Sequence, residues 1–446
     1  MKTNFSKQLI LVTIFALSVN FAFAQSIVIP KQKRLAVGNA TNPSGNFQDL
    51  DLEKSDKKIE YVFHFTMSKS DYKKLLKKDN VEKDCITACS ASLNNDSLSL
   101  KEIELRGKSS MTFKRKSFSV KLNEKISLNK NGTTFKFKKF NLISLSMDEN
   151  YYRNKVAFDL MNYLGIFNLF YSYSEVIVNG ESQGIYLMLQ KPKNYAFKHE
   201  NADVLLRRDY QHVVKKTYYK GDDTTRKAEC EKVFLSIYDE ILKKKGQDLY
   251  EELSNVLDID QYFTWMAFNY FIENGDYTDE VFFYNKAEHD SIKFGIIPWD
   301  YDDIFYDYPR EGYLLRYINF GDRLAFSSED DLDYEIISND YTYIKYLEIL
   351  AGLIDEISIP VLKQIFETTY QELYPFYCKE EILKMSKFDK YGKTSLQLLK
   401  ADMQSNYDRL VKRREDVIFE LESLIRSSKN TKVVPGSKSV ATNNHQ

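Results

Sequence analysis

The sequence predicts an α+β protein of two lobes, with a β-rich N-terminal lobe and a mainly α-helical C-terminal lobe. Apolar residues alternate with polar ones in most segments between residues 59 and 207, which is the pattern of half-buried strands. Beyond about residue 220, the apolar residues recur at helical spacing instead. At 446 residues the chain is long enough for two lobes that share a cleft.

The overall charge is nearly balanced. Lys and Arg number 63 and Asp and Glu number 64, so the formal net charge is −1. This balance gives no reason to expect a nucleic-acid or membrane-surface partner. Apolar residues make up 43% of the chain and aromatic residues 14%, which is enough for a large core that is rich in rings.

The N-terminal segment 1–24 is typical of a cleaved signal peptide. Lys2 and Lys7 precede an apolar stretch at 9–19 that is too short to span a bilayer, and Ala22-Phe23-Ala24 fits a cleavage site. An uncleaved anchor helix is the alternative. We find no other apolar run of about 18 residues. We therefore expect an exported protein, in the periplasm, at the cell surface or outside the cell, without stable membrane insertion.

The four cysteines permit disulfides in an exported protein. Four cysteines allow three pairings, which the sequence leaves open. Cys85 and Cys89 are close enough in sequence to pair with each other, and ordinary buried thiols are the alternative. The other two are Cys230 and Cys378.

The N-terminal lobe is expected over residues 58–215, after a linker or lead-in segment at 25–57. Within it, Phe118, Val120 and Leu122 form one apolar strand face. Asn179-Gly180 is a strong turn signal between two strands. The predicted strands are 59–65, 117–122, 173–178, 184–189 and 203–207. One predicted helix begins at Ser70-Asp71, and another covers 150–164.

The C-terminal lobe is expected over residues 216–428, before a disordered tail at 429–446. Its segment 261–273 is apolar nearly all round, which indicates a helix buried in a core, and Gly275 is suited to end that helix. A β-hairpin is predicted next, and the remaining segments are helical. The hairpin strands are 281–284 and 292–297, and the other helices are 232–242, 250–257 and several between about 340 and 428.

Acidic residues stand at both ends of the predicted hairpin. Asp276 precedes it, and Asp300, Asp302 and Asp303 follow it. Asp300 and Asp302 are two apart at a strand end, so both can point the same way and offer hard oxygen ligands to Mg²⁺, Mn²⁺ or Ca²⁺. Protein kinases use this order, with the first carboxylate as base and the second group as metal ligands. Taken singly, each would be an ordinary acidic turn.

Three basic residues of the first half are candidate phosphate ligands. Arg106 lies in a Gly-Ser turn whose backbone N–H groups can bind phosphate, and Arg106 or Lys108 can neutralise its charge. Lys121 stands mid-strand opposite the apolar face, where kinases place a phosphate-binding lysine. Arg153 opens the helix at 150–164. Solvated surface positions are the ordinary interpretation of each.

Read together, these segments resemble the spore-coat protein H (CotH) family of atypical protein kinases. The matching motifs occur in the family's order and cover roughly residues 60 to 305. They are Leu105-Arg106-Gly107-Lys108-Ser109-Ser110, Lys116-Ser117-Phe118-Ser119-Val120-Lys121-Leu122, Asn141-Leu142, Arg153-Asn154-Lys155, Val178-Asn179-Gly180, Gln183-Gly184-Ile185-Tyr186-Leu187, Asn274-Gly275-Asp276 and Pro298-Trp299-Asp300-Tyr301-Asp302.

The resemblance implies a two-lobed kinase-like fold that binds ATP with Mg²⁺ (or Mn²⁺ or Ca²⁺) and phosphorylates Ser or Thr of a protein substrate. It implies that Asp276 acts as base and that Asp300, assisted by Asp302, binds metal. It also implies that Lys121 contacts phosphate, with Arg106 and Arg153 as further candidate ligands.

Two positions depart from the family pattern. Val281 stands where kinases usually carry a metal-binding asparagine, and Asp279 or Glu280 could supply that ligand instead. Gln190 stands where the family often has an acidic residue. Two other functions stay open: a non-catalytic surface or assembly protein with a nucleotide or calcium site, and a glycan hydrolase with Asp276 and Asp300 as its paired carboxylates.

Overall fold

The computed structural model describes residues 49–76, 85–107, 109–130, 132–209, 212–221, 224–287, 291–307, 323–326 and 329–430. The predicted signal peptide and nearly all of the predicted tail lie outside these residues. The chain divides into two compact units, Lys31–Val411 and Met1–Pro30 with Lys412–Gln446. In the second unit, the described residues are 412–430, which belong to helix α12 (Leu396–Asn430). All that follows concerns the first unit.

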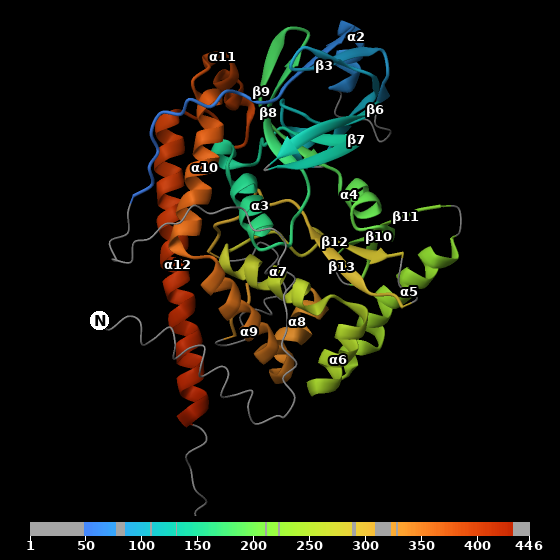
Figure 1. The fold of residues 1–446 in the computed structure, drawn as a ribbon, viewed down its shortest axis with the longest axis vertical. Coiled ribbons are helices and arrows are strands. Elements are labelled where there is room, and N and C mark those ends of the chain that lie inside the picture. Colours follow the sequence, from blue (N-terminus) through green and yellow to red (C-terminus); the bar gives the residue numbers. More distant parts are fainter. Residues whose placement is uncertain are drawn as a thin grey trace, which may run out of the picture. The chain divides into compact units, whose positions relative to one another are not determined.

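The first half of the chain forms a nine-stranded sheet (Figure 1). Its order is β2-β5-β6-β7-β9-β8-β1-β3-β4, and the neighbours are antiparallel except for β1 and β8. Phe118, Val120 and Leu122 are buried in one core, as the alternation predicts. The bounds are β1 Val62–Met67, β2 Cys85–Ile86, β3 Cys89–Leu93, β4 Asp96–Leu98, β5 Leu100–Arg106, β6 Ser117–Lys130, β7 Thr133–Ile143, β8 Tyr171–Val178 and β9 Glu181–Gln190.

A second, four-stranded antiparallel sheet has the order β11-β10-β12-β13. It contains the predicted hairpin, β12 (Val281–Lys286) and β13 (Phe294–Pro298), together with β10 (Ala202–Arg208) and β11 (Val214–Tyr219). Strand β10 lies inside the residues expected for the N-terminal lobe, yet it pairs with β12. The sequence analysis missed β11 because its residues are partly exposed along its length and show no apolar alternation.

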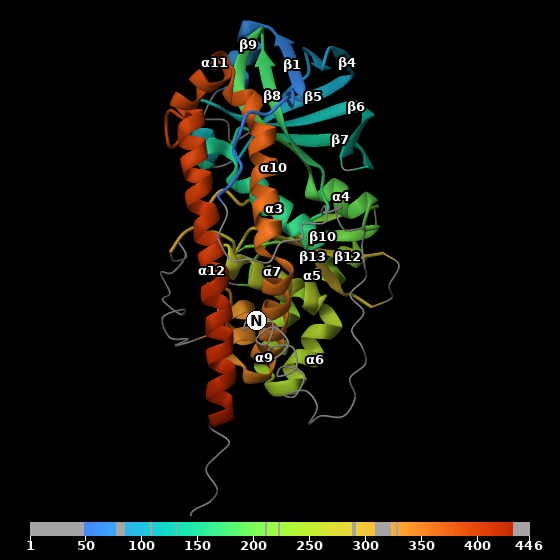
Figure 2. The same ribbon diagram turned by 60° about the vertical axis from the view of Figure 1, so that its left-hand side comes forward.

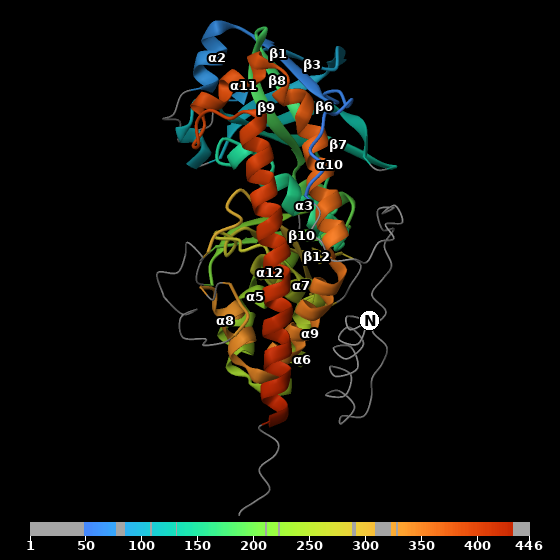
Figure 3. The same ribbon diagram turned by 90° about the vertical axis from the view of Figure 1, so that its left-hand side faces the viewer.

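The second half is mainly helical, so the α+β prediction is confirmed. Figures 2 and 3 show α10 beside the first turns of α12, and the Phe366 and Tyr407 ring centroids lie 5.8 Å apart. The helices are α2 Lys69–Leu75, α3 Arg153–Tyr163, α4 Pro192–Lys198, α5 Thr225–Asp239, α6 Gly246–Val256, α7 Ile259–Phe271, α8 Asp331–Ser338, α9 Asp340–Glu356, α10 Ile359–Tyr377 and α11 Glu380–Leu383.

The described part of the lead-in segment runs along the helices. The Leu50 N–H donates to Gln404 Oε1 at 2.9 Å, and the Asp51 N–H donates to Glu367 Oε1 at 2.7 Å.

All four cysteines are free thiols, so the disulfide that the sequence permits between Cys85 and Cys89 is not formed. Among the helices of the described residues, none combines the length and apolar character that crossing a membrane requires.

Candidate active site

The two acidic loops are joined by backbone hydrogen bonds at the end of α7. The Gly275 N–H donates to the Asp303 carbonyl at 2.8 Å, and the Phe305 N–H donates to the Ile272 carbonyl at 3.1 Å. A Cβ at Gly275 would lie 3.3 Å from the Tyr306 ring, so the close approach favours glycine. The helix itself ends at Phe271, so the prediction that Gly275 terminates it was wrong; Gly275 instead allows two loops to meet.

The hairpin brings its two ends to the same place. Val281 pairs with Pro298, and the Trp299 N–H donates to the Glu280 carbonyl at 2.9 Å. Asp276 is fixed beside them, because its N–H donates to Asn274 Oδ1 at 3.2 Å and Asn274 is fully buried. The loop before β12 and the loop after β13 therefore form one acidic surface.

The carboxylates of this surface repel one another. Burial raises the pKa of Asp300, and the charges of Asp276 and Asp303 raise it further against the opposing effect of Arg106. Burial also raises the pKa of Asp302 well above its usual range, with the charge of Asp300 as the next cause. Asp300 has a φ of 51°, a conformation that costs free energy in residues other than glycine.

A basic residue from the other sheet faces these carboxylates. The Arg106 guanidinium, at the end of β5, lies 5.3 Å from the centroid of the Trp299 ring. Burial lowers the pKa of Arg106, and the charges of Asp300, Glu280 and Asp302 oppose that effect. The structure therefore brings together four of the six predicted site residues, namely Arg106, Asp276, Asp300 and Asp302.

The two acids that could replace the missing asparagine already have basic partners. Glu280 Oε2 lies 2.6 Å from a guanidinium nitrogen of Arg207, and Asp279 pairs with Lys215. Burial raises the pKa of Glu280 well above its usual range, and the charge of Asp300 adds to this rise. Glu280 is thus near enough to Asp300 to belong to the same charge cluster.

The other two predicted residues have carboxylate partners outside this cluster. Lys121 Nζ lies 2.7 Å from Glu102 Oε1, its cross-strand neighbour on β5. Arg153 pairs with Glu149 at 2.5 Å, and it also donates to the Ile304 carbonyl at 3.4 Å. The Arg153 side chain therefore contacts the backbone of the acidic loop, at a carbonyl two residues after Asp302.

Three residues at this site had no role assigned from the sequence, namely Lys191, Ser119 and Asn154. Lys191 Nζ donates to Ser119 Oγ, Ser119 Oγ donates to Glu104 Oε1 at 2.8 Å, and the charges of Glu104 and Arg106 both act on Lys191. Burial lowers the pKa of Lys191 to about 8. The third is Asn154, which accepts a hydrogen bond from the Tyr301 N–H at 2.9 Å. The Lys191-Pro192 pair at a strand end was the available signal for Lys191.

The described residues contain no group of three or more His, Cys, Asp or Glu side chains that is arranged to hold a metal ion. Asp300 and Asp302 nonetheless suit a cation chemically. They are oxygen ligands, and they are close enough to repel each other. A divalent cation here would offset that repulsion, which adds to the effect of burial in raising their pKa values.

Comparison with known proteins identifies the family. A model of the family described as CotH kinase protein matches residues 103–426. The chain belongs to the CotH kinase family. This confirms the resemblance found in the sequence and makes the chain a kinase-like protein.

Individual relatives are more distant. Inner spore coat protein H of Bacillus subtilis (strain 168) is 26% identical over 248 residues, which are 51% of this chain and 64% of the relative. The chain thus matches less than two thirds of that protein's length. A solved chain from the HipA, HipB and operator DNA complex of Shewanella oneidensis MR-1 has a TM-score of 0.29 and 14% identity, covering 66% of this chain and 65% of that chain. A likeness this low carries no argument.

Proposed function

We propose that this CotH-family protein is an exported protein kinase that transfers the γ-phosphoryl group of ATP to Ser or Thr hydroxyls of a protein substrate. The observation that supports this most is the convergence of Asp276, Asp300 and Asp302 at one end of a hairpin that faces Arg106. Phosphoryl transfer depends on positioning and charge neutralisation, and this arrangement offers both.

The acidic residues divide into two roles. ATP with a bound divalent metal supplies the phosphoryl group and a partly neutralised triphosphate. Asp300 and Asp302 would hold the metal, Mg²⁺ or the similar Mn²⁺ or Ca²⁺. Asp276, which is half-buried and fixed by Asn274, would accept the proton of the substrate hydroxyl.

The basic residues would hold the phosphates. Arg106 already faces the carboxylates, and Lys191 lies near Arg106. The Lys191 ammonium donates to Ser119 Oγ, and no carboxylate of the described residues accepts a hydrogen bond from it. Lys121 and Arg153 stay predicted ligands. To reach phosphate, Lys121 would have to break its ion pair with Glu102, and Arg153 its ion pair with Glu149. The structure thus makes Lys191 a competitor for the role that the sequence gave to Lys121.

Export is part of the same proposal. The sequence of residues 1–24 supports it, and the match to a relative named as a spore coat protein agrees with a location outside the cytoplasm. The expected partner is a protein that carries Ser or Thr acceptors.

The function is tested by label transfer from γ-labelled ATP. The mature protein should label itself or an added Ser-rich protein in Mg²⁺ or Mn²⁺, and EDTA should abolish the label while excess metal restores it. Phosphoamino-acid analysis should show phosphoserine or phosphothreonine. Metal-dependent nucleotide binding without any transfer would contradict the kinase proposal and would favour a non-catalytic role.

A pair of lysine variants identifies the phosphate ligand. Lys191→Met should lower the rate of label transfer at least about tenfold, because a charge-assisted contact to phosphate contributes about 1.5–3 kcal/mol. Lys121→Met should change the rate little, since Lys121 already pairs with Glu102 across the strands. The reverse order of effects would return the role to Lys121.

A further inference from the structure

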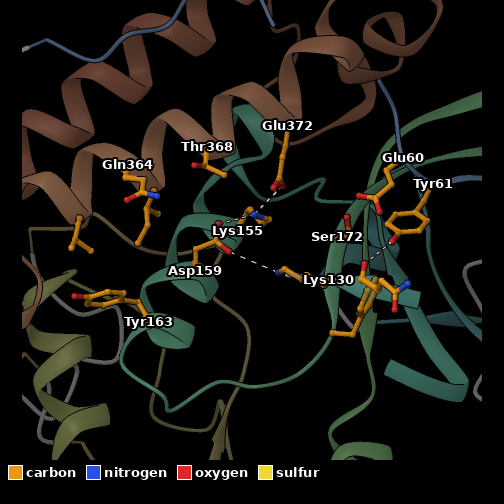
Figure 4. Close-up of a pocket in the computed structure, with 14 residues that line it drawn as sticks. Glu60, Tyr61, Lys130, Lys155, Asp159, Tyr163, Ser172, Gln364, Thr368 and Glu372 are labelled. Carbon is orange, nitrogen blue, oxygen red and sulfur yellow. Dashed lines mark hydrogen bonds and ion pairs between the residues drawn. The ribbon is translucent and has the colours of Figure 1, made fainter. Parts of the chain in front are cut away.

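A cavity apart from the acidic surface lies between α3, α10, the strands β6 and β8, and the two residues that precede β1 (Figure 4). Its volume is about 320 Å³, near the lower end of the range for small-molecule sites. None of its lining residues belongs to the acidic surface or to its basic partners. In Figure 4, Lys130, Lys155 and Asp159 lie between Tyr163 at one end and Tyr61 at the other.

Two amino groups and three carboxylates line this cavity. Lys155 Nζ lies 2.6 Å from Asp159 Oδ2 and 3.0 Å from Glu372 Oε2, so one ammonium serves both carboxylates. Lys130 contributes the second ammonium, and Glu60 adds an exposed carboxylate at the rim. An anionic ligand would meet three carboxylates, and a cationic ligand would meet the Lys155 ammonium and, below about pH 7, that of Lys130. The lining therefore favours a neutral ligand.

Lys130 has donors that the described residues do not use. Its Nζ is buried without a hydrogen-bond partner, and the Asp159 Oδ1 atom, 3.9 Å away, is beyond hydrogen-bond distance. The same Nζ lies 3.0 Å from the centroid of the Tyr171 ring. A buried donor without an acceptor is rare and unfavourable, so this atom marks a place for an acceptor group from a ligand.

The other lining groups complement a hydroxylated molecule. Ser172, Thr368 and Glu372 offer acceptors and donors around the cavity. Tyr61, Tyr163 and Phe170 contribute aromatic rings to the lining. A molecule that presents hydroxyl groups on its edges and C–H groups on its faces satisfies both kinds of surface.

We propose that this cavity is a binding site for a small neutral carbohydrate of monosaccharide or disaccharide size, with a hydroxyl oxygen that accepts from Lys130 Nζ. Hydroxyl hydrogens would be donated to Glu372 and Thr368, and the sugar C–H faces would pack on the aromatic rings. No covalent step is involved, and the site is independent of phosphoryl transfer.

Lys130 should reduce stability when no ligand is bound. Burial and, next, the charge of Lys155 lower its pKa to about 7, against the opposing charges of Asp159, Glu372 and Glu60. Between about pH 10.5 and 7 the unfolded chain binds a proton that the folded chain does not, so this residue's contribution to stability falls as pH falls. Lys130→Met should therefore raise the midpoint of thermal unfolding, and by more at neutral pH than at alkaline pH. An unchanged or lowered midpoint would contradict a destabilising effect of this buried amino group.

The proposal is tested by thermal unfolding of the mature chain, without nucleotide, against glucose and maltose, with glucuronate and glucosamine as charged counterparts. A neutral sugar should raise the unfolding midpoint in a saturable way. Lys130→Met and the cavity-filling Thr368→Leu should lose this shift, while Lys136→Met, which alters an exposed lysine on the neighbouring strand, should keep it. Asp276→Asn should also keep the sugar-induced shift, because Asp276 does not line the cavity. A failure of the kinase proposal would therefore not affect the test of the carbohydrate proposal.

Three results would overturn the carbohydrate proposal. The first is a shift that never saturates and persists equally in Lys130→Met, since sugars also stabilise proteins generally by exclusion from their surface. The second is a larger shift with glucuronate or glucosamine than with the neutral sugars. The third is no shift with any of the four.

Discussion

Asp276→Asn is expected to lower the rate of label transfer by about 10²–10⁴-fold, the contribution of a positioned general base. The amide has nearly the same shape as the carboxylate but does not accept the hydroxyl proton. Asp276 is only half-buried, and its backbone contact to Asn274 does not involve its carboxylate, so the fold should persist. Initial rates measure the first effect, and thermal unfolding measures the second.

Asp300→Asn serves as the matched variant, because it should fail for a different reason. It removes a metal ligand, so excess Mn²⁺ should restore part of its activity, while no metal concentration should restore Asp276→Asn. Its unfolding midpoint should not fall, because burial and the charge of Asp276 act against the ionised form of Asp300. Undiminished transfer in both variants, or metal rescue of Asp276→Asn, would refute the assigned roles.

Much of the acidic surface could be predicted from sequence because its determinants are local. The apolar segment 261–273 indicated a buried helix, and the alternating strands beyond it indicated a hairpin. Asp276 and Asp300 flank that hairpin, so a hairpin alone brings them to one end. The sequence could not show that the Gly275 N–H joins the two loops, because that bond depends on tertiary packing.

The basic side of the site was harder to predict because it depends on strand register. Alternation places Lys121 on the polar face of β6, but it does not say which residue lies opposite. In the structure Glu102 is its partner on β5, and a cross-strand ion pair forms. Lys191 follows β9, two strands away from β6 in the sheet, and only the sheet order brings it to Ser119.

The second sheet shows the same limit on a larger scale. Strand β10 is followed in the chain by β11 and the three α-helices α5, α6 and α7 before its other partner, β12, appears. Nothing in the pattern of β10 distinguishes this partner from the strands of the first sheet. The pairing places Arg207 and Arg208 beside the loop that precedes β12, and sequence reasoning assigned neither residue a role.

Arg208→Met is expected to lower the free energy of unfolding by about 3–5 kcal/mol, the usual effect of removing one partner of a buried ion pair. The Arg208 guanidinium is fully buried and lies 3.3 Å from Asp330 Oδ1 and 3.5 Å from Asp333 Oδ2. Methionine fills much of the space but leaves both carboxylates without their cation. Denaturant unfolding of the purified variant measures the loss.

Arg207→Met is the matched control on the adjacent residue. Arg207 keeps 23% of its side chain exposed, and burial already raises the pKa of its partner Glu280 well above the usual range, so Glu280 can take up a proton when Arg207 is lost. We therefore expect a smaller loss of stability than for Arg208→Met. Equal losses for the two variants would contradict a special role for the buried cation.

Arg208 also donates to the Thr278 carbonyl at 2.8 Å, within the loop that carries Asp276. Arg208→Met should therefore also lower label transfer at temperatures where the chain is still folded, because the same guanidinium holds both the core and the loop of the proposed base.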